Sequence, residues 1–483
     1  MIGRTNEIPC PLRAAAQATP DSPAIVDVDG TTTYRELDLR VSSVAERLRE
    51  GGCVLGSRVA LYLEKDERYI VLLLALVLRV GAVACPISTR TPPDGVPSLI
   101  ETARCSGVIS SEETVLNAAS AQISRLNPHV LLEDLDTSTS RDLEDMLHLD
   151  LRESATIVFT SGSTGSPKAA LHTLGNHYYS ALGSNANIKL DPGDRWLHSL
   201  PLHHVGGISI LFRVLLSRTT LALPETTAPL GESITRLEAT HISLVATQLR
   251  RMLAEDDVPA GLKAILMGAS AMPPGLIHEA HSRGLPLHTS YGLTEMASQV
   301  SATVPDAPLE QLKTSGCVLT HRELRVDEDG EILVRGETLF TGYVEGDQII
   351  RPLDTDGWFH TKDLGIQTSD GFLIVHGRKD NLFISGGENI QPEEIEEAFL
   401  DLPGVSDAVV VDVPDPEFGY RPVAFVRRAG TDTSMNLQEE LYRVLPRFKV
   451  PKTIYVWPAD APEGMKVDRS FMRDRALRLS GEG

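Results

Sequence analysis

A short loop of glycines, hydroxyl residues and one lysine is the part of the sequence best suited to bind a phosphate. It follows the apolar residues 155–159 and reads Thr160-Ser161-Gly162-Ser163-Thr164-Gly165-Ser166-Pro167-Lys168. Glycines let a backbone approach a ligand closely, N–H and O–H groups donate to phosphate oxygens, and lysine adds a point charge. The spacing GxxxxGK[ST] of the P-loop fails, because Pro167 stands five positions after Gly162. We predict a phosphate loop of another kind; a flexible surface loop of the same composition stays an alternative.

Four further segments carry polar residues in a suggestive order. They are Tyr-Gly-Leu-Thr-Glu at 291–295, Gly-Trp-Phe-His-Thr-Lys-Asp at 357–363, Gly-Arg-Lys-Asp at 377–380 and Pro-Glu-Gly-Met-Lys-Val-Asp-Arg at 462–469. Each is a weak signal alone. Together with the loop, and in this order, they resemble the motifs of the adenylate-forming superfamily of acyl-CoA synthetases, luciferases and adenylation domains. The resemblance implies an enzyme that joins a carboxylate to AMP, releases pyrophosphate, and then passes the acyl group to a thiol.

The resemblance also implies how ATP and Mg²⁺ are held. Residues 160–168 would hold the β- and γ-phosphates, Thr294 would bond a phosphate, and Glu295 would ligate Mg²⁺. A carboxylate suits that place only if a cation lies between it and the triphosphate. Tyr291 would stack on adenine, and Asp363 would accept both ribose hydroxyls. The other implied nucleotide contacts are Gly268, Ala269, Ser270, Gly292 and Arg378.

By the same resemblance, Lys466 is the predicted catalytic lysine. The chain departs from the usual pattern here, since Met465 separates Gly464 from Lys466 and a threonine is missing. A cation at this position would bridge the attacking carboxylate and the α-phosphate and stabilise the charge that develops. Another lysine in a basic C-terminal segment is the alternative interpretation.

The resemblance further implies a small domain that rotates between two half-reactions. The hinge would be Lys379 and Asp380, and coenzyme A would pass Ser385, Gly386 and Gly387, which would line its tunnel after the rotation. A simple hairpin would explain the two glycines equally well.

The acid-binding residues are predicted from a segment rich in histidine and glycine. His203 and His204 resemble the family's segment at the mouth of the acyl pocket, and residues 199–204 contain no acid that could pair with an α-ammonium, which argues against an amino-acid substrate. The segments 168–173, 244–249, 380–388, 390–394 and 417–423 are similar to the branch of the family that ligates 2-succinylbenzoate to coenzyme A in menaquinone biosynthesis. Because this acid has two carboxylates, Arg213 is the candidate for the second one; a structural arginine is the alternative. Ser209 and Thr247 are weaker pocket candidates.

The elements that must position these residues alternate between helical and strand patterns. We predict an α/β protein with a large N-terminal domain at 1–377, made of α/β subdomains at 1–150 and 151–305 and a small β-barrel-like unit at 306–377. A hinge at 378–380 leads to a smaller mobile α+β domain at 381–483. Specific expectations are a helix that opens at 33–36, a helix at 392–400, strands at 408–413, 422–426 and 453–457, and a helix near 436–445.

Composition limits the function classes. The 483 residues carry a net charge of −21, which argues against a nucleic-acid-binding protein because such a protein needs a basic face. Five dispersed cysteines and no signal peptide favour a cytoplasmic protein. The apolar run 69–87 is broken by Arg79, Gly81 and Pro86, so we expect a buried helix, a turn and a strand instead of a membrane span.

The expected partners are a small carboxylic acid, ATP and coenzyme A, with Mg²⁺; a homodimer is left open. Three alternatives remain at this point: a ligase for another aryl or medium-chain acid, an enzyme that acylates a carrier-protein thiol, and a nucleotide-binding regulator without catalysis.

Overall fold

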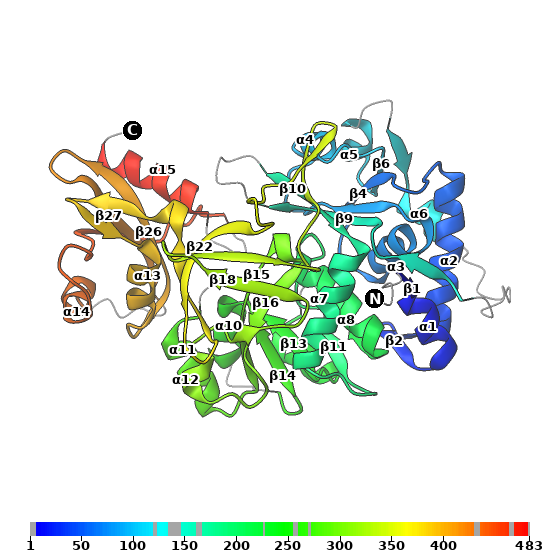
Figure 1. Ribbon diagram of the computed structural model, residues 1–483, viewed down its shortest axis with the longest axis horizontal. Coiled ribbons are helices and arrows are strands. Elements are labelled where there is room, and N and C mark those ends of the chain that lie inside the picture. Colours follow the sequence, from blue (N-terminus) through cyan, green and yellow to red (C-terminus); the bar gives the residue numbers. More distant parts are fainter. Residues whose placement is uncertain are drawn as a thin grey trace.

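A large N-terminal part and a smaller C-terminal cap make up the protein (Figure 1). The computed structural model describes residues 6–118, 123–133, 146–160, 167–225, 228–254, 259–268, 272–428, 435–462 and 468–481. Three of the predicted site segments lie wholly outside these ranges: the loop residues Ser161, Gly162, Ser163, Thr164 and Gly165; Ala269 and Ser270; and Lys466.

An eight-stranded sheet forms the first layer of the N-terminal part. Its order is β21-β20-β10-β9-β5-β4-β6-β7. The strands β4, β5, β6, β7 and β9 run parallel, as expected for strands joined by helices, whereas β10, β20 and β21 are added antiparallel at one side. The bounds are β4 Arg58–Tyr62, β5 Val83–Pro86, β6 Gly107–Ser110, β7 Ser124–Leu126, β9 Ser154–Thr160, β10 Lys168–Thr173, β20 Gly342–Glu345 and β21 Gln348–Ile350.

A nine-stranded sheet forms the second layer, in the order β17-β16-β15-β14-β13-β11-β12-β2-β3. The bounds are β2 Pro23–Val26, β3 Thr31–Thr33, β11 Arg195–Leu197, β12 Thr220–Ala222, β13 His241–Leu244, β14 Ala264–Met267, β15 Leu287–Leu293, β16 Ser298–Ala302 and β17 Cys317–Val318. The two layers exchange strands: β2 and β3 come from the start of the chain but join the second sheet, while β20 and β21 come from beyond residue 340 and join the first. The sequence patterns did not predict this exchange.

The buried faces of several helices share one core with strands of both sheets. Thr33 caps α2 (Tyr34–Glu50) with a capping box to Glu36, which confirms the predicted helix start. The apolar run becomes α3 (Glu67–Ala75), a π-helical turn η1 (Leu76–Val80) and β5, as predicted, and no helix in the described ranges is long and apolar enough to cross a membrane. Two further central helices are α7 (Leu174–Asn187) and α8 (Val205–Ser217).

Shorter elements complete the N-terminal part. These are β1 Glu7–Pro9, α1 Pro11–Ala18, α4 Val96–Thr102, α5 Glu113–Ala118, α6 Pro128–Leu132, β8 His148–Asp150, α9 Leu230–Arg236, α10 Ala246–Ala254, α11 Pro274–Ser282, a 3₁₀ turn η2 Thr294–Met296 and α12 Leu309–Leu312.

A four-stranded antiparallel sheet leads from the N-terminal part to the cap. Its strands are β18 Arg322–Val326, β19 Glu331–Gly336, β22 Phe359–Gln367 and β23 Leu373–Arg378, and they lie next to one another in chain order. A single 3₁₀ turn, η3 (Lys379–Asn381), follows β23 directly and begins the passage to the cap.

The cap has its own sheet and cores. The predicted helices and strands are confirmed with small shifts in their ends, as α13 Pro392–Leu400, β26 Val405–Asp415, β27 Gly419–Arg428, α14 Leu437–Val444 and β28 Thr453–Val456. Two short strands, β24 Phe383–Ser385 and β25 Glu388–Ile390, were not predicted. A final helix, α15 (Arg469–Ser480), was not predicted, although Asp468 is an N-cap signal for it. The cap touches the large part where Gly275 N–H donates to Asp401 Oδ1 at 3.3 Å and where Arg250 donates to the carbonyl of Ser406.

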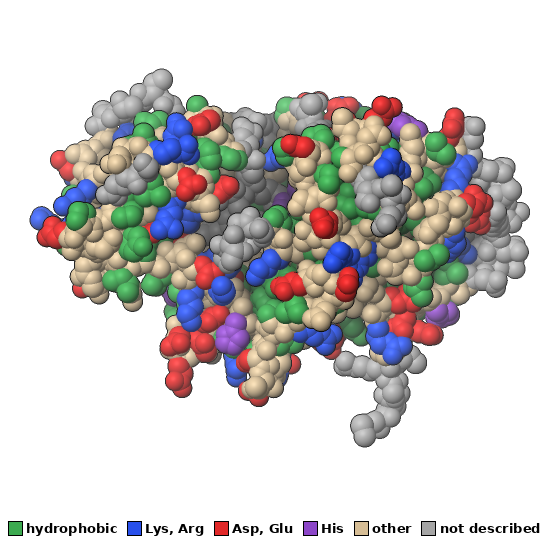
Figure 2. Space-filling model, turned by 90° about the horizontal axis from the view of Figure 1, so that it is seen from above, with side chains coloured by type: hydrophobic (Ala, Val, Ile, Leu, Met, Phe, Trp, Pro, Cys, Tyr) green, Lys and Arg blue, Asp and Glu red, His purple; other side chains and the backbone are tan. Residues whose placement is uncertain are grey.

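Charged side chains of both signs are mixed on one face of the protein. On this face, acidic and basic groups lie among one another and neither gathers into a broad patch (Figure 2). Since the net charge is −21, anionic ligands must be bound by local groups.

Candidate active site

The two strands on either side of the predicted phosphate loop are paired. Thr160, at the end of β9, is directly opposite Lys168, at the start of β10. The Lys168 side chain is exposed, and its Nζ lies 5.1 Å from the centre of the Tyr343 ring on β20. The hairpin thus places one lysine beside the loop and over an aromatic ring that the sequence analysis did not select.

The carboxyl ends of three parallel strands supply the next residues. Gly268 follows β14, Tyr291 lies near the end of β15, and Thr247 comes shortly after β13. This edge is the usual ligand side of an open parallel sheet. Gly292 is required there because a Cβ would lie 2.3 Å from the carbonyl oxygen of Ser298.

A carboxylate on β22 is joined to residues from two neighbouring segments. Tyr291 donates its hydroxyl to Asp363 Oδ2 at 2.6 Å, and Arg378 Nη1 donates to Asp363 Oδ1 at 3.0 Å. Asp363 and Arg378 are directly opposite in the β22–β23 pair. Burial and the nearby Asp363 raise the pKa of Tyr291 well above its usual value, so its hydroxyl is a neutral donor. The structure therefore brings together three residues that were predicted from separate motifs.

Glu295 is held in the turn η2 by a segment that sequence reasoning missed. Tyr343 donates its hydroxyl to Glu295 Oε1 at 2.5 Å, and the N–H of Phe340 donates to the Glu295 carbonyl at 2.8 Å. Burial, followed by the charge of Glu295, raises the pKa of Tyr343. The Gly-Tyr pair at 342–343 was interpreted only as part of a strand; its aromatic hydroxyl was the available signal.

His172 on β10 fixes the other half of the same turn. Its Nε2 lies 2.7 Å from the carbonyl oxygen of Thr294, so Nε2 carries the proton and donates. Burial lowers the pKa of His172 to about 4, which keeps the ring neutral near pH 7. Strands β10 and β20 of the first sheet thus anchor the Thr294–Glu295 turn, which connects β15 to β16 in the second sheet.

The donor set around this turn fits Mg²⁺. Mg²⁺ in nucleotide sites uses one or two carboxylates, substrate phosphates and several waters. Glu295 is half-buried and supplies one carboxylate, one of whose oxygens accepts from Tyr343. A second cluster, Asp327, Glu331 and His360, brings three possible ligand atoms within 4.8 Å, but Lys379 Nζ already lies 3.2 Å from Glu331.

The predicted acid-binding residues lie just before α8, on α8 and at the start of α10. His203 and His204 precede this helix with ring centres 4.5 Å apart, and burial lowers the pKa of His203 to about 4. Ser209 is buried and donates to the carbonyl of Gly206 in its own helix, at 2.8 Å. Thr247 is exposed at the start of α10.

Arg213 is a buried cation. Its Nη2 donates to Gln299 Oε1 at 2.8 Å, and its guanidinium lies 5.0 Å from the Trp196 ring. Burial, with a contribution from the charge of Arg322, lowers the pKa of Arg213 to about 9, so it is still charged near neutrality. Arg322 is also buried, and its guanidinium donates to oxygens of Ser180, Gln299 and Thr320. No acidic side chain in the described ranges forms an ion pair with either arginine.

The predicted hinge and the coenzyme A residues lie close together in sequence. Lys379 and Asp380 form η3, and both are exposed. Ser385 is buried at the end of β24, whereas Gly386 and Gly387 turn the chain into β25 and are exposed to solvent. Gly386 has φ +59°, and a Cβ there would lie 2.7 Å from the Phe418 ring.

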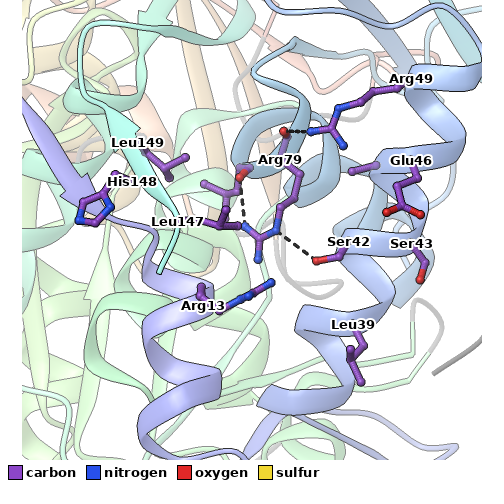
Figure 3. Close-up of a pocket in the computed structure, with 12 residues that line it drawn as sticks. Arg13, Leu39, Ser42, Ser43, Glu46, Arg49, Arg79, Leu147, His148 and Leu149 are labelled. Atoms are coloured by element: carbon purple, nitrogen blue, oxygen red, sulfur yellow. Dashed lines mark hydrogen bonds between the residues drawn. The ribbon is translucent and has the colours of Figure 1, made fainter. Parts of the chain in front are cut away.

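A cavity of about 330 Å³ lies far from these residues, between α1, α2 and β8 (Figure 3). Arg79 reaches it from η1 and donates to Ser42 and Cys10, and both Arg79 and Arg13 pair with the fully buried Asp38. The arginine that interrupts the apolar run thus has a structural partner, and no predicted site residue lines this cavity.

Comparison with known proteins agrees with the motifs. The AMP-binding enzyme model matches residues 12–344, and the AMP-binding enzyme C-terminal domain matches residues 394–463. The 2-succinylbenzoate–CoA ligase of Bacillus thuringiensis subsp. konkukian is 32% identical over 455 residues, which cover 91% of this chain and 92% of the relative. The corresponding ligase of Bacillus licheniformis is 31% identical and covers 92% and 95%.

Two solved structures are similar over almost the whole chain. The o-succinylbenzoate CoA synthetase of Bacillus subtilis with its acyl-adenylate intermediate has a TM-score of 0.87 at 29% identity and covers 97% of this chain and 98% of that one. The same enzyme with ATP and a magnesium ion has a TM-score of 0.85 at 28% identity, with 96% and 99% covered. The membership predicted from the motifs is confirmed: the chain belongs to the AMP-binding enzyme family.

Proposed function

We propose that this protein is an ATP-dependent 2-succinylbenzoate–CoA ligase of menaquinone biosynthesis. It forms 2-succinylbenzoyl-AMP with release of pyrophosphate, and then 2-succinylbenzoyl-CoA with release of AMP. The observation that carries this proposal is the likeness to ligases of this acid along nine-tenths of both chains. The hydrogen bonds that join Tyr291 to Asp363 and Tyr343 to Glu295 support the nucleotide half of the assignment.

The proposed nucleotide roles rest on the contacts that these residues make. The Asp363 carboxylate accepts hydrogen bonds from Tyr291 and Arg378. Its oxygens would also accept hydrogen bonds from the ribose hydroxyls. Tyr291 and Gly268 end neighbouring strands and would face adenine. Glu295 would hold Mg²⁺, which when bound screens the triphosphate and orients it. Thr160, Lys168 and Thr294 border the space for the phosphates.

Lys466 would act on the reacting groups themselves. Its positive charge would reduce the repulsion between the substrate carboxylate and the α-phosphate, and it would stabilise the charge that develops as the two anions meet. Three residues later, Arg469 pairs with Glu396 at 2.6 Å and approaches Glu393 at 3.5 Å. This half-buried ion pair anchors the start of α15, just after the lysine segment, to α13.

The second carboxylate of the acid requires a cation in a largely apolar region. Arg213 and Arg322 are buried, and neither has an acidic partner in the described ranges. A carboxylate bound at Arg213 would therefore compensate a positive charge that these residues of the protein leave unpaired. Arg213 is therefore the proposed second-carboxylate residue. His203, His204, Ser209 and Thr247 are proposed to shape the pocket.

The two half-reactions would use two orientations of the cap. In our assignment the cap turns about Lys379 and Asp380, so that Lys466 serves adenylation and Ser385, Gly386 and Gly387 serve the thiol step. We also assign the domains as predicted, with the boundary at 378–380. The cytoplasmic location and the homodimer stay predictions.

The test is a pyrophosphate-release screen over a panel of acids, each with and without coenzyme A. We expect 2-succinylbenzoate to be strongly preferred, with acyl-CoA formed only when coenzyme A is present. Preference for an unrelated aryl or medium-chain acid would overturn the substrate, and acylation of a carrier-protein thiol instead of coenzyme A would overturn the acceptor. ATP binding without pyrophosphate release for any acid would overturn the enzymatic assignment.

A further inference from the structure

A lysine occupies a backbone position that favours glycine. Lys362, in β22, has φ +63°, in the left-handed region that side chains disfavour. Its N–H donates to Glu331 Oε1 at 3.0 Å, which fixes the backbone in this conformation. Glycine would adopt the same conformation without strain, so the question is what the lysine side chain does.

The side chain of Lys362 reaches the predicted hinge. Its Nζ lies 3.1 Å from both carboxylate oxygens of Asp380 in η3. In a second ion pair the cation lies in the hinge turn and the anion on the sheet: Lys379 Nζ in η3 is 3.2 Å from Glu331 Oε2 on β19. Two ion pairs therefore tie the hinge turn to the four-stranded sheet of the large part.

The same aspartate is linked to the nucleotide site. Arg378 Nη2 lies 3.8 Å from Asp380, while Arg378 Nη1 donates to Asp363 at 3.0 Å. Charges of alternating sign thus run from Lys362 through Asp380 and Arg378 to Asp363, the proposed ribose ligand. The position of the hinge aspartate is set relative to the site where AMP is made.

We infer that Lys362 is a positioning residue for the hinge: its ion pair with Asp380 holds the cap in the orientation seen here and has to break before the cap can rotate. This inference rests on the proposed function, which requires the rotation. In the present orientation Gly386 and Gly387 are exposed, so they do not line a tunnel for coenzyme A. Loss of the ion pair is therefore expected to favour the thiol half-reaction over adenylation.

The expected effect is modest because the pair is partly solvated. The side chains of Lys362 and Asp380 are 50% and 31% exposed. Pairs of this kind change an equilibrium by a few-fold and weaken as salt screens them. Such a pair can hold a resting orientation and still break in every catalytic cycle.

The test compares the two half-reactions in Lys362→Met, which keeps the aliphatic stem and the backbone demand but removes the charge. The first rate constant is that of pyrophosphate release without coenzyme A, and the second is that of acyl-CoA formation when coenzyme A is added to the preformed acyl-adenylate enzyme. The ratio of the second to the first is expected to rise about 2- to 5-fold. Lys313→Met is the matched control, since Lys313 is 41% exposed and pairs with Glu310 at 2.7 Å on a distant helix.

A salt titration separates a charge effect from a merely structural one. Raising the ionic strength from about 0.05 M to about 0.5 M is expected to raise the wild-type ratio by a similar factor. The ratio of Lys362→Met should rise less, because salt then screens the Lys379–Glu331 pair but no longer a Lys362–Asp380 pair. Lys362→Gly removes both the charge and the backbone strain, and it keeps the test possible if the Met variant does not fold. An unchanged ratio in the folded variant, or equal salt dependence in both proteins, would overturn the inference. Failure of the wild type to adenylate any acid would instead overturn the proposed function.

Discussion

Two carboxylates, Glu295 of the proposed metal site and Asp380 of the proposed hinge, are held in opposite ways. Glu295 is half-buried, and its partners are the neutral Tyr343 hydroxyl and, through its backbone, the N–H of Phe340. Asp380 is exposed, and its partners are the cations Lys362 and Arg378. One region is tied by hydrogen bonds between strands, and the other by ion pairs at the surface.

This difference corresponds to the tasks proposed for the two regions. Hydrogen bonds between sheet-borne, buried groups are directional and insensitive to salt, so they suit a metal ligand whose position must not change. Exposed ion pairs are weak and screened, so they suit a hinge that must open and close repeatedly. Experiments that remove one contact at a time from each region test the contrast.

The largest effect is expected at Glu295. Glu295→Gln keeps an oxygen that accepts from Tyr343 but removes the negative charge that Mg²⁺ requires. Since metal-ion stabilisation is worth several kcal/mol, pyrophosphate release should fall on the order of 100-fold. Glu279→Gln, at an exposed position on α11, is the control. A rate near that of the wild type in Glu295→Gln would remove this residue from the metal site.

The second-largest effect is expected at Tyr343, whose hydroxyl donates to Glu295. Tyr343→Phe keeps the ring beside Lys168 and Phe340 but leaves Glu295 without its hydroxyl donor. The loss of such an outer partner typically weakens metal binding 10- to 100-fold, so the Mg²⁺ concentration for half-maximal pyrophosphate release should rise about 10-fold. Direct titration of ATP-bound protein with Mn²⁺, followed by electron paramagnetic resonance, should show the same shift. Tyr442→Phe, an exposed tyrosine on α14, should change neither value.

The two regions also differ in how far the sequence predicted them. The residues Tyr291, Asp363 and Arg378 were predicted from motif order, and the structure joins them by hydrogen bonds. Local signals served well elsewhere too, as in the capping box at Thr33 and the proline at the start of α13. Such features depend on neighbours in sequence, and a single chain displays them directly.

The anchors of Glu295 were missed because they depend on strand pairing across the chain. Tyr343 reaches Glu295 only because β20 pairs with β10, which is about 170 residues earlier, and no local pattern predicts that pairing. The hinge posed a different difficulty. The sequence shows a lysine at 362, but neither its positive φ nor its contact with Asp380 can be derived from the motif.

The free energy of unfolding should depend on pH through His172, which is buried beside the Thr294–Glu295 turn. Burial lowers the pKa of His172 to about 4 from a usual value near 6.5, so between these values the unfolded chain binds the proton and the native one does not. Its contribution to stability is complete above pH 6.5 and is lost as the pH falls toward 4. The wild type should therefore lose about 3 kcal/mol more of its unfolding free energy than His172→Gln over this range.

The measurement for His172 is urea unfolding of both proteins between pH 7 and pH 4, at low and at high salt. His278→Gln, at an exposed position on α11, is the control and should follow the wild type. Parallel pH profiles for the wild type and His172→Gln would show that the histidine does not resist protonation in the native state. Strong salt dependence of their difference would contradict the view that this region is insensitive to screening.

The smallest effect is expected at the second hinge ion pair. Lys379→Met removes a cation from Glu331, but Glu331 keeps the N–H of Lys362 at 3.0 Å and His360 at 3.6 Å. Without Lys362, by contrast, Asp380 has Arg378, at 3.8 Å, as its one ion-pair partner among the residues that the structure describes. The ratio of the thiol to the adenylation rate constant should therefore rise only about 2-fold, less than in Lys362→Met. In the double variant, a change equal to the product of the two single changes would show that the pairs act independently, and a smaller change would show that they share one rotation barrier. If both single variants leave the ratio and its salt dependence unchanged, hydrogen bonds such as that from Asn381 to Glu393 hold the hinge, and the two regions are then built alike.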